Sequence, residues 1–351
     1  MSQNQERGLY IHIPFCQSRC PYCSFYSETG LHLSDDFLEA LANEAQEFKG
    51  YCFSTCYIGG GTPSVLSPDQ TERLFGIIRE NFELDRGAEI TVEVNPESAT
   101  GDLLRTLKGL GANRLSVGAQ STWDSELERL GRRHRNSDTI RCVENALAVG
   151  FSNINLDLIF GFIGQTEESW RKSLVRATEL PITHISTYAL SPHGGVEELS
   201  EEEIIVMYEI RDEVLGARGF LRYEISNYAR PGYESVHNLI YWRRKEYLGL
   251  GPSASSFMGN RRWRNEPDLE LYLKAPPFQR EEETLTPEQA RLEEIFLGLR
   301  LSDGIDLGIS ELPEELVGLV EIKNRRVSLT PKGVLVSDRV ALELFEVLGN
   351  Q

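Results

Sequence analysis

The first 190 residues repeat one pattern, a short strand followed by a helix, and this alternation most limits what the chain can fold into. Strands are predicted where apolar and polar residues alternate or where short apolar runs occur, at 9–13, 57–58, 90–94, 115–117, 154–158 and 185–190. Strands that alternate with helices indicate a parallel sheet of the α/β class. Both a full or partial (β/α) barrel and a doubly wound open sheet would give this alternation.

The helices between the strands carry clear start and stop signals. Ser67 and Pro68 form a capping signature before one helix, and the helix predicted from Thr139 to Val149 stops at Gly150. The barrel is favoured because Glu93, Gln120 and Asp157 fall at or near the ends of predicted strands, where barrels place their sites.

The pattern changes after about residue 260, so we predict a barrel domain over 1–260 and a smaller domain over 261–351. The second part begins with a charged stretch at 280–283 and continues with a helix from Pro287 to Leu297. A strand at 326–330 then precedes a helix from Pro331 to Leu348. These elements predict a small α+β, winged-helix-like module.

Charge and hydropathy exclude some classes of protein. The formal net charge is -18 and the pI is about 4.9, which would repel a phosphate backbone, so we expect no nucleic-acid partner. No apolar run approaches the roughly 18 residues that span a bilayer, and residues 1–7 lack the apolar stretch of a signal peptide. The sequence therefore predicts a cytoplasmic protein.

Three cysteines lie within eight residues, in a C-x3-C-x2-C motif directly after the first strand: Cys16, Cys20 and Cys23. Three thiolates can hold a [4Fe–4S] cluster and leave its fourth iron open. A zinc site is the alternative, but structural zinc uses four ligands, and the nearby His12 lies within the alternation of the strand. The remaining cysteines are predicted to be buried core thiols, and they are Cys52, Cys56 and Cys142.

Two further features suggest a ligand near these cysteines. The glycine run 59–61 follows the second strand, where the backbone could approach a ligand closely, although a tight turn would use glycine as well. Glu93 points away from the apolar face of its strand, so in a barrel it faces the lumen and requires a cationic partner. A carboxylate that faces solvent is the alternative.

Several segments together resemble the oxygen-independent coproporphyrinogen III oxidase family of the radical SAM superfamily, from about residue 8 to the C-terminus. They are 10–16, 59–64, 93–97, 116–121, 155–161, 251–254, 296–301 and 329–333. The resemblance implies a partial (β/α)6 barrel with S-adenosylmethionine (SAM) on the fourth iron. By position, the family's SAM contacts fall on Tyr10, Tyr22, Gly60, Gly61, Thr62, Glu93, Gln120, Arg132, Asp157 and Ala189.

Two groups share this scaffold, the true oxidases and the HemW-type haem chaperones. True oxidases carry a fourth cysteine two residues after the third, where this chain has Phe25, and the cluster loop here begins only sixteen residues from the start. The segment 237–242 matches the H-N-x-x-Y-W pattern of the chaperones. It predicts a haem contact by His237, Tyr241 and Trp242, against the alternative of a hydrogen-bonded core histidine.

The favoured function is therefore a chaperone that binds haem and delivers it to apo-haemoproteins such as respiratory enzymes. The alternative is an oxidase that decarboxylates two propionates of coproporphyrinogen III to give protoporphyrinogen IX through a 5′-deoxyadenosyl radical, so enzymatic activity stays open. A homodimer and transient membrane contact through the recipient proteins stay open as well. Radical modification of RNA or protein is disfavoured by the negative charge.

Overall fold

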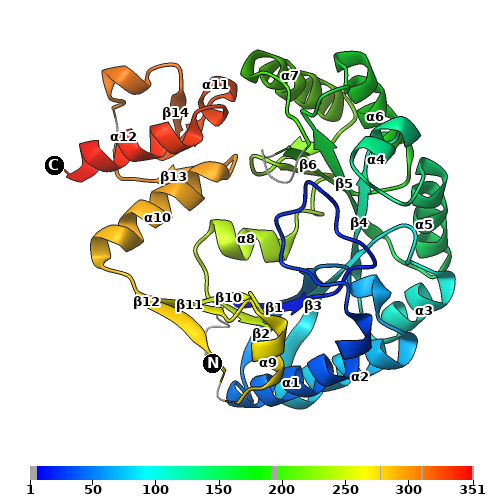
Figure 1. Cartoon of the computed structure of the whole chain (residues 1–351). Coiled ribbons are helices and arrows are strands. Elements are labelled where there is room, and N and C mark those ends of the chain that lie inside the picture. The colour runs from blue at the N-terminus through cyan, green and yellow to red at the C-terminus, as the bar shows by residue number, and fades with distance from the viewer. Residues whose placement is uncertain (1–5, 191–195, 277, 310, 350–351) are drawn as a thin grey trace.

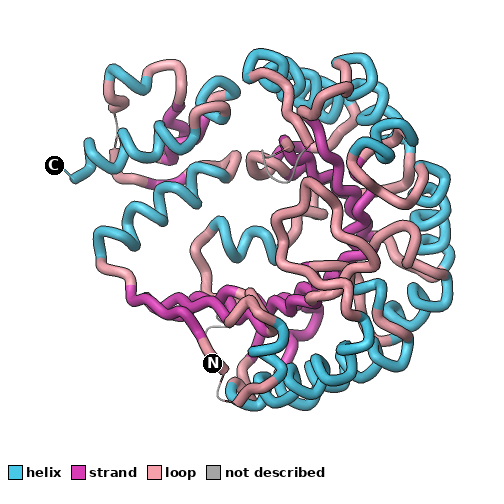
Figure 2. Tube along the Cα trace, in the orientation of Figure 1, coloured by secondary structure: helices cyan, strands magenta, loops and turns pink. Residues whose placement is uncertain are grey.

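The computed structural model of the chain describes residues 6–190, 196–276, 278–309 and 311–349. Its centre is a run of parallel strands, each paired with the next, that curves into an arc (Figures 1 and 2). The strands are β1 (Gly8–Ile13), β2 (Cys52–Gly60), β3 (Glu83–Val94), β4 (Arg114–Gln120), β5 (Asn153–Phe160) and β6 (His184–Ala189). This is the partial (β/α)6 barrel that the sequence predicts, and the doubly wound alternative is wrong.

Helices cover the outside of the arc, as the tube view shows (Figure 2). They are α1 (Ser34–Glu47), α2 (Pro68–Asn81), α3 (Gly101–Gly109), α4 (Asp124–Arg129), α5 (Asn136–Ala148), α6 (Glu167–Glu179) and α7 (Glu201–Ala217). The capping signature at Ser67 is confirmed, since its side chain accepts a hydrogen bond from the Gln70 N–H and the Ser67 backbone N–H donates one to Gln70 Oε1. Buried apolar residues of the strands and of these helices other than α4 form one continuous core.

The sheet continues beyond the six parallel strands at both ends. Next to β1 lie β9 (Tyr247–Leu250), β10 (Ser255–Met258), β11 (Arg261–Asn265) and β12 (Arg280–Thr284), and next to β6 lie β8 (Asn227–Ala229) and β7 (Leu221–Arg222). The arc is therefore open, with β12 and β7 as its edges. Strands β11 and β12 belong to this sheet although they follow residue 260, and the domain boundary at 260 stays a prediction.

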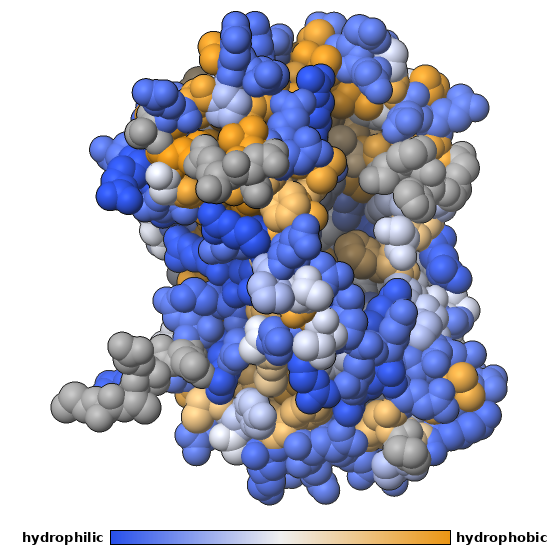
Figure 3. All heavy atoms as spheres, turned by 90° about the vertical axis from the view of Figure 1, so that its left-hand side faces the viewer, coloured by the Kyte–Doolittle hydropathy of each residue, from blue (hydrophilic) through white to orange (hydrophobic). Residues whose placement is uncertain are grey.

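A second, smaller core lies in the C-terminal part. Its elements are α10 (Pro287–Arg300), β13 (Ile305–Asp306), β14 (Val320–Lys323), β15 (Arg326–Leu329), α11 (Pro331–Val334) and α12 (Ser337–Gly349), and its three strands form an antiparallel sheet. The helix predicted from Pro331 to Leu348 is thus two helices. The winged-helix-like assignment stays a prediction. The face of the molecule on this side is mostly hydrophilic, with hydrophobic residues gathered mainly in its upper half (Figure 3).

Two short helices complete the described fold, α8 (Val236–Trp242) and α9 (Leu269–Leu273), together with 3-10 turns at 31–33, 63–65 and 314–316. Figure 1 shows α8 inside the arc of strands, whereas α1 to α7 lie outside it. Within the described ranges, every helix is too short or too polar to span a bilayer.

Candidate functional site

A cavity of about 390 Å³ opens at the carboxyl ends of the parallel strands, beneath the loop that follows β1. Residues from β2 to β6 and from this loop line it, as expected for a barrel site. All three motif cysteines contribute, and so do nine of the ten predicted SAM residues: Tyr22, Gly60, Gly61, Thr62, Glu93, Gln120, Arg132, Asp157 and Ala189. The tenth, Tyr10, lies within β1, and its hydroxyl shares a hydrogen bond with His12 Nδ1 (3.0 Å).

The cysteine loop is held closed at its base by backbone hydrogen bonds between Cys16 N and Glu28 O (2.9 Å) and between Glu28 N and Pro14 O (2.7 Å). All three thiols are free and partly exposed. In the described residues, no three His, Cys, Asp or Glu side chains gather tightly enough to hold a single metal ion. Because each thiolate of a [4Fe–4S] cluster binds a different iron, its sulfurs stand further apart than the ligands of one ion. A set of three thiolates fits a [4Fe–4S] cluster with one open iron better than structural zinc, which uses four ligands.

The other zinc candidate, His12, is not free to bind a metal. It is buried, Nδ1 pairs with the Tyr10 hydroxyl, and Nε2 lies 2.9 Å from the Tyr26 carbonyl oxygen. Burial lowers the pKa of His12 to about 4, so the ring is neutral near pH 7. His12 is thus a hydrogen-bonded strand residue beneath the cysteine loop.

Two of the three remaining cysteines occupy the predicted core. Cys56 and Cys142 are buried, and burial raises the pKa of both thiols to about 12. The prediction for Cys52 is wrong, because this residue is exposed and its Sγ donates to Glu83 Oε2 (3.2 Å). Cys52 is the first residue of β2, at the end of the strand away from the cavity.

The glycine run after β2 packs tightly against β1 and the cysteine loop. Gly60 has a φ of +105°, and a Cβ on it would approach His12 Nδ1 to 2.6 Å. A Cβ on Gly61 would lie 2.6 Å from the Phe15 carbonyl oxygen, whereas Gly61 N donates to Ile13 O (2.8 Å). Only glycine fits at these two positions, and the turn brings bare backbone to the wall of the cavity.

Glu93 faces the lumen near the end of β3, as expected. Its Oε1 accepts a hydrogen bond from the Tyr57 hydroxyl (2.7 Å), and its Oε2 accepts one from Gly60 N (3.1 Å). Desolvation raises the pKa of Glu93 to about 7, although the Tyr57 hydrogen bond opposes the rise. A lumen carboxylate with this pKa is suited to meet a cationic ligand, which would stabilise its ionised form.

Asp157 on β5 forms the far wall and accepts hydrogen bonds from Ser116 Oγ (3.0 Å) and Asn155 Nδ2 (2.9 Å). Burial raises its pKa as well, so the cavity holds two carboxylates that the protein alone leaves under-stabilised. Each is the kind of group that is perturbed at functional sites.

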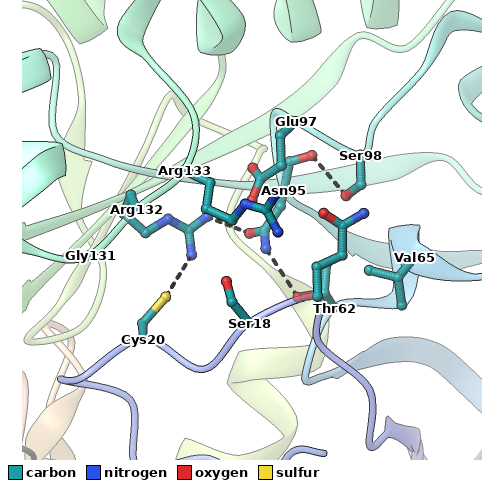
Figure 4. Close-up of a pocket in the computed structure, with 11 residues that line it drawn as sticks. Ser18, Cys20, Thr62, Val65, Asn95, Glu97, Ser98, Gly131, Arg132 and Arg133 are labelled. Atoms are coloured by element: carbon teal, nitrogen blue, oxygen red, sulfur yellow. Dashed lines mark hydrogen bonds between the residues drawn. The ribbon is translucent and has the colours of Figure 1, made fainter. Parts of the chain in front are cut away.

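Arg132 connects the cavity to the cysteine loop (Figure 4). Its Nη2 donates to Asn95 Oδ1 (2.7 Å) and to the Gly118 carbonyl oxygen (3.2 Å), and its Nη1 lies 3.5 Å from Cys20 Sγ. Its buried Nε has no hydrogen-bond partner among the described residues. Asn95 in turn donates to Thr62 Oγ1 (3.0 Å), which shares a hydrogen bond with Cys16 Sγ (3.3 Å). One polar network thus reaches two of the three thiols.

Gln120 ends β4 with a φ of 64°, in the left-handed region that residues other than glycine rarely adopt. The register between β4 and β5 shifts at this point, which turns the Gln120 side chain into the cavity. Such backbone strain concentrates at functional sites.

The predicted haem residues do not line the cavity. His237 is 1% exposed, its Nδ1 pairs with Thr55 Oγ1 (2.7 Å), and its Nε2 pairs with the Tyr241 hydroxyl (2.8 Å). Trp242 packs its ring against the Arg300 guanidinium at 4.4 Å. The geometry is that of the hydrogen-bonded core histidine, and this arrangement leaves neither ring nitrogen for haem iron.

Sequence reasoning missed several cavity residues, namely Tyr57, Asn95, Ser116, Gly118 and Tyr188. The register could have found one of them, since Ser116 on β4 is the pairing partner of Glu93 on β3 and shares its face of the sheet. Tyr57 could have been found as well, because it lies two positions before Gly59 of the predicted glycine run and therefore points to the same side of β2.

Comparison with known proteins agrees with this geometry. The profile of the Radical SAM superfamily matches residues 10–177. The chain is 37% identical to the heme chaperone HemW of Lactococcus lactis over 85% of this chain and 82% of that protein. It is 34% identical to the heme chaperone HemW of Mycobacterium tuberculosis over 97% and 95% of the two chains. The chain belongs to the HemW family.

Membership of the HemW family, and with it of the radical SAM superfamily, implies a [4Fe–4S] cluster and SAM as the cofactors. The crystallised coproporphyrinogen III oxidase HemN of Escherichia coli has the same fold, with a TM-score of 0.83 at 25% identity, over 97% of this chain and 90% of that one. The chaperones and the oxidase therefore share one scaffold, and the scaffold alone does not separate the two activities.

Proposed function

We propose that this member of the HemW family is a haem chaperone that holds a [4Fe–4S] cluster and SAM in the barrel cavity. The observation that carries the proposal is the cavity itself, which gathers the three cysteines and nine predicted SAM residues. Cys16, Cys20 and Cys23 would ligate three irons. The bound cluster would supply an open iron for SAM and one-electron chemistry.

The remaining wall of the cavity suits SAM, which carries a cationic ammonium and sulfonium and an anionic carboxylate. Glu93 and Asp157 offer carboxylates for the cationic groups, and Arg132 offers a guanidinium for the anionic one. Gly60 and Gly61 bring backbone polar groups to the same wall. Tyr22, Thr62, Gln120 and Ala189 would complete the contact.

Delivery of haem is favoured over oxidase activity by the relatives, which are chaperones by name over most of the chain. The residue two positions after Cys23 points the same way, because Phe25 stands there and its side chain is 65% exposed. We assign the haem site no residue, since both ring nitrogens of His237 are used. Apo-haemoproteins such as respiratory enzymes are the proposed recipients, and a homodimer stays a prediction.

The test uses anaerobically reconstituted protein with dithionite, SAM and coproporphyrinogen III, with a haem titration in parallel. Stoichiometric haem binding without decarboxylated product supports the chaperone. Formation of protoporphyrinogen IX would make the chain an oxidase.

The cluster assignment is tested by Cys20→Ala, with the exposed Cys52→Ala as the matched control. Cys20→Ala should abolish the visible absorbance of the reconstituted cluster, because one of its three thiolate ligands is gone, whereas Cys52→Ala should keep it in full. An equal loss in both variants would contradict the assignment. Haem binding should survive in both.

A further inference from the structure

The H-N-x-x-Y-W segment at 237–242 contributes no residue to the lining of the cavity, yet it lies within the same barrel. Helix α8 sits inside the arc of strands (Figure 1). His237 packs against the first residue of β1, where a Cβ on Gly8 would meet the imidazole Cε1 at 3.1 Å. Gly8 pairs with Thr55 in the amino-terminal half of β2. The segment therefore closes the lumen at the end opposite the cysteine loop.

The backbone of α8 is fixed by a carboxylate of the barrel. Glu89 on β3 accepts hydrogen bonds from His237 N (3.0 Å), Val236 N (3.1 Å) and Ser235 Oγ (3.3 Å). The negative charge of Glu89 at the start of α8 also interacts favourably with the positive end of the helix dipole. The imidazole is consequently held in place by its own main chain as well as by its two ring hydrogen bonds.

The imidazole of His237 supports the side chains that lie next to it in the lumen. Its ring stacks on Tyr57, with centroids 5.1 Å apart and an interplanar angle of 28°. Thr55 and Tyr57 are two apart on β2 and share its lumen face, so one imidazole bonds the first and supports the second. The Tyr57 hydroxyl then donates to Glu93 Oε1 (2.7 Å). A continuous column runs from His237 through Tyr57 to Glu93.

We propose that His237 is a positioning residue for SAM: through the stacked ring of Tyr57 it holds the Glu93 carboxylate toward the cationic end of the ligand. This inference rests on the proposed function, because it requires SAM in the cavity. It assigns the chaperone-type segment to the cofactor site and not to haem.

Electrostatics of the column agree with this role. Burial, together with the nearby charge of Arg114, lowers the pKa of His237 to about 3, so the imidazole is a neutral support near pH 7. Glu93 is faced by Tyr57 on β2, Tyr10 on β1, Arg114 on β4, Asp157 on β5 and Tyr241 on α8. Among these groups, Tyr57 donates the hydrogen bond that favours the ionised carboxylate.

The experiment measures SAM binding to the cluster-loaded protein by equilibrium dialysis between pH 5.5 and 8.5, with haem titrations and melting curves in parallel. The variants are Tyr57→Phe, which keeps the ring and removes the hydroxyl, and His237→Ala, which removes the support beneath it. Val236→Ala is the matched control, because Val236 lies on α8 but its side chain is 47% exposed.

Tyr57→Phe should weaken SAM binding about tenfold, because a hydrogen bond to a charged group is lost. Its pH midpoint for SAM binding should rise, since the ionised form of Glu93 loses a donor. His237→Ala should show the same upward shift, which a merely structural role would not produce. Val236→Ala should bind SAM as the wild type does, and all three variants should bind haem.

Unchanged SAM affinity and midpoint in both Tyr57→Phe and His237→Ala would overturn the inference. Loss of haem binding in His237→Ala with unchanged SAM binding would also overturn it and would place haem on α8, leaving the chaperone function intact. If the wild type binds no SAM at any pH, the SAM site of the proposed function fails and the inference fails with it.

Discussion

Two buried carboxylates in different regions of the protein, Glu44 and Glu93, have very different hydrogen-bonding environments. Glu44 on α1 is fully buried where that helix meets the sheet extension β9–β12. Its donors are Gly251 N (2.9 Å), Asn265 Nδ2 (2.7 Å), the Tyr272 hydroxyl (2.6 Å) and Arg280 Nη2 (3.4 Å). Glu93, in the cavity, receives hydrogen bonds from two groups of the described chain, the Tyr57 hydroxyl and Gly60 N.

This difference in the number of hydrogen-bond donors distinguishes a carboxylate with a structural role from one with a ligand-binding role. Burial raises the pKa of both carboxylates, but Glu44 has four donors, one of them the cation of Arg280, so it holds elements together, and removing it leaves those donors without their acceptor. A carboxylate with fewer donors and a pKa near 7 is destabilising when ionised until a ligand arrives. Substitutions near Glu44 should therefore affect the fold, whereas substitutions near Glu93 should affect ligand binding and leave the fold intact or more stable.

The largest effect is expected for Glu44→Ala, which should lower the free energy of unfolding by about 3–5 kcal/mol because the buried donors of Gly251, Asn265 and Tyr272 lose their acceptor. Urea denaturation of the cofactor-free protein at pH 7 measures this change. The control is Glu47→Ala, which removes the other carboxylate paired with Arg280 (2.8 Å) from a more exposed position and should cost about 0–1 kcal/mol. Equal losses of unfolding free energy in the two variants would contradict a structural role specific to Glu44.

Glu93→Gln should change the free energy of unfolding in the opposite direction, by raising it. The pKa of Glu93 rises from 4.5 to about 7 on folding, so its stabilising contribution is complete below pH 4.5 and is lost as pH rises through 7. The amide avoids that loss, and at pH 8 the cofactor-free variant should be more stable than the wild type by up to about 3 kcal/mol.

The measurement for Glu93→Gln is urea denaturation from pH 4 to pH 8. The two curves should meet near pH 4 and diverge as pH rises, and the exposed Glu83→Gln on the same strand should follow the wild type. A variant that is less stable than the wild type at pH 8 would show that Glu93 is a structural charge like Glu44.

Gln120→Gly should give the smallest effect, a stabilisation of about 1 kcal/mol, because glycine adopts the left-handed φ of this position without strain. SAM binding should weaken as the side chain leaves the cavity. Asn324→Gly is the control, since Asn324 also has a positive φ (51°) but lies in the turn between β14 and β15, where asparagine is tolerated. A larger gain at Asn324 would argue against strain stored at the cavity.

Sequence patterns predicted the regular part of the barrel because its strands and helices are read from local periodicity. Strand β3 begins at Glu83, seven residues before the predicted start, since residues 83–87 have no apolar alternation. Strand β12 consists of Arg280-Glu281-Glu282-Glu283-Thr284, which looks like a charged linker. It is a strand because ion pairs such as Arg262 with Glu283 and Arg261 with Glu282 match it to β11.

The cysteine motif predicted the centre of the site because all three thiols lie on one short loop. The role of α8 depends on contacts that spacing cannot show. The i, i+4 spacing of His237 and Tyr241 predicts that they share a helix face, but the bond from His237 to Thr55 joins residues 182 positions apart. The cavity residues from β2 to β6 could be ordered only once the strand register was known.

The position of β1 between β2 and β9 affects how the protein is made on the ribosome. One edge of β1 pairs early with β2, but the other meets β9, and the ion pair beside it joins Arg7 to Glu246, 239 positions later. At a synthesis rate of about 5–20 residues per second, that second edge waits about 12–48 seconds for its partner. The loop with the three cysteines follows this strand directly, so the nascent chain displays its iron ligands before the barrel wall beside them exists.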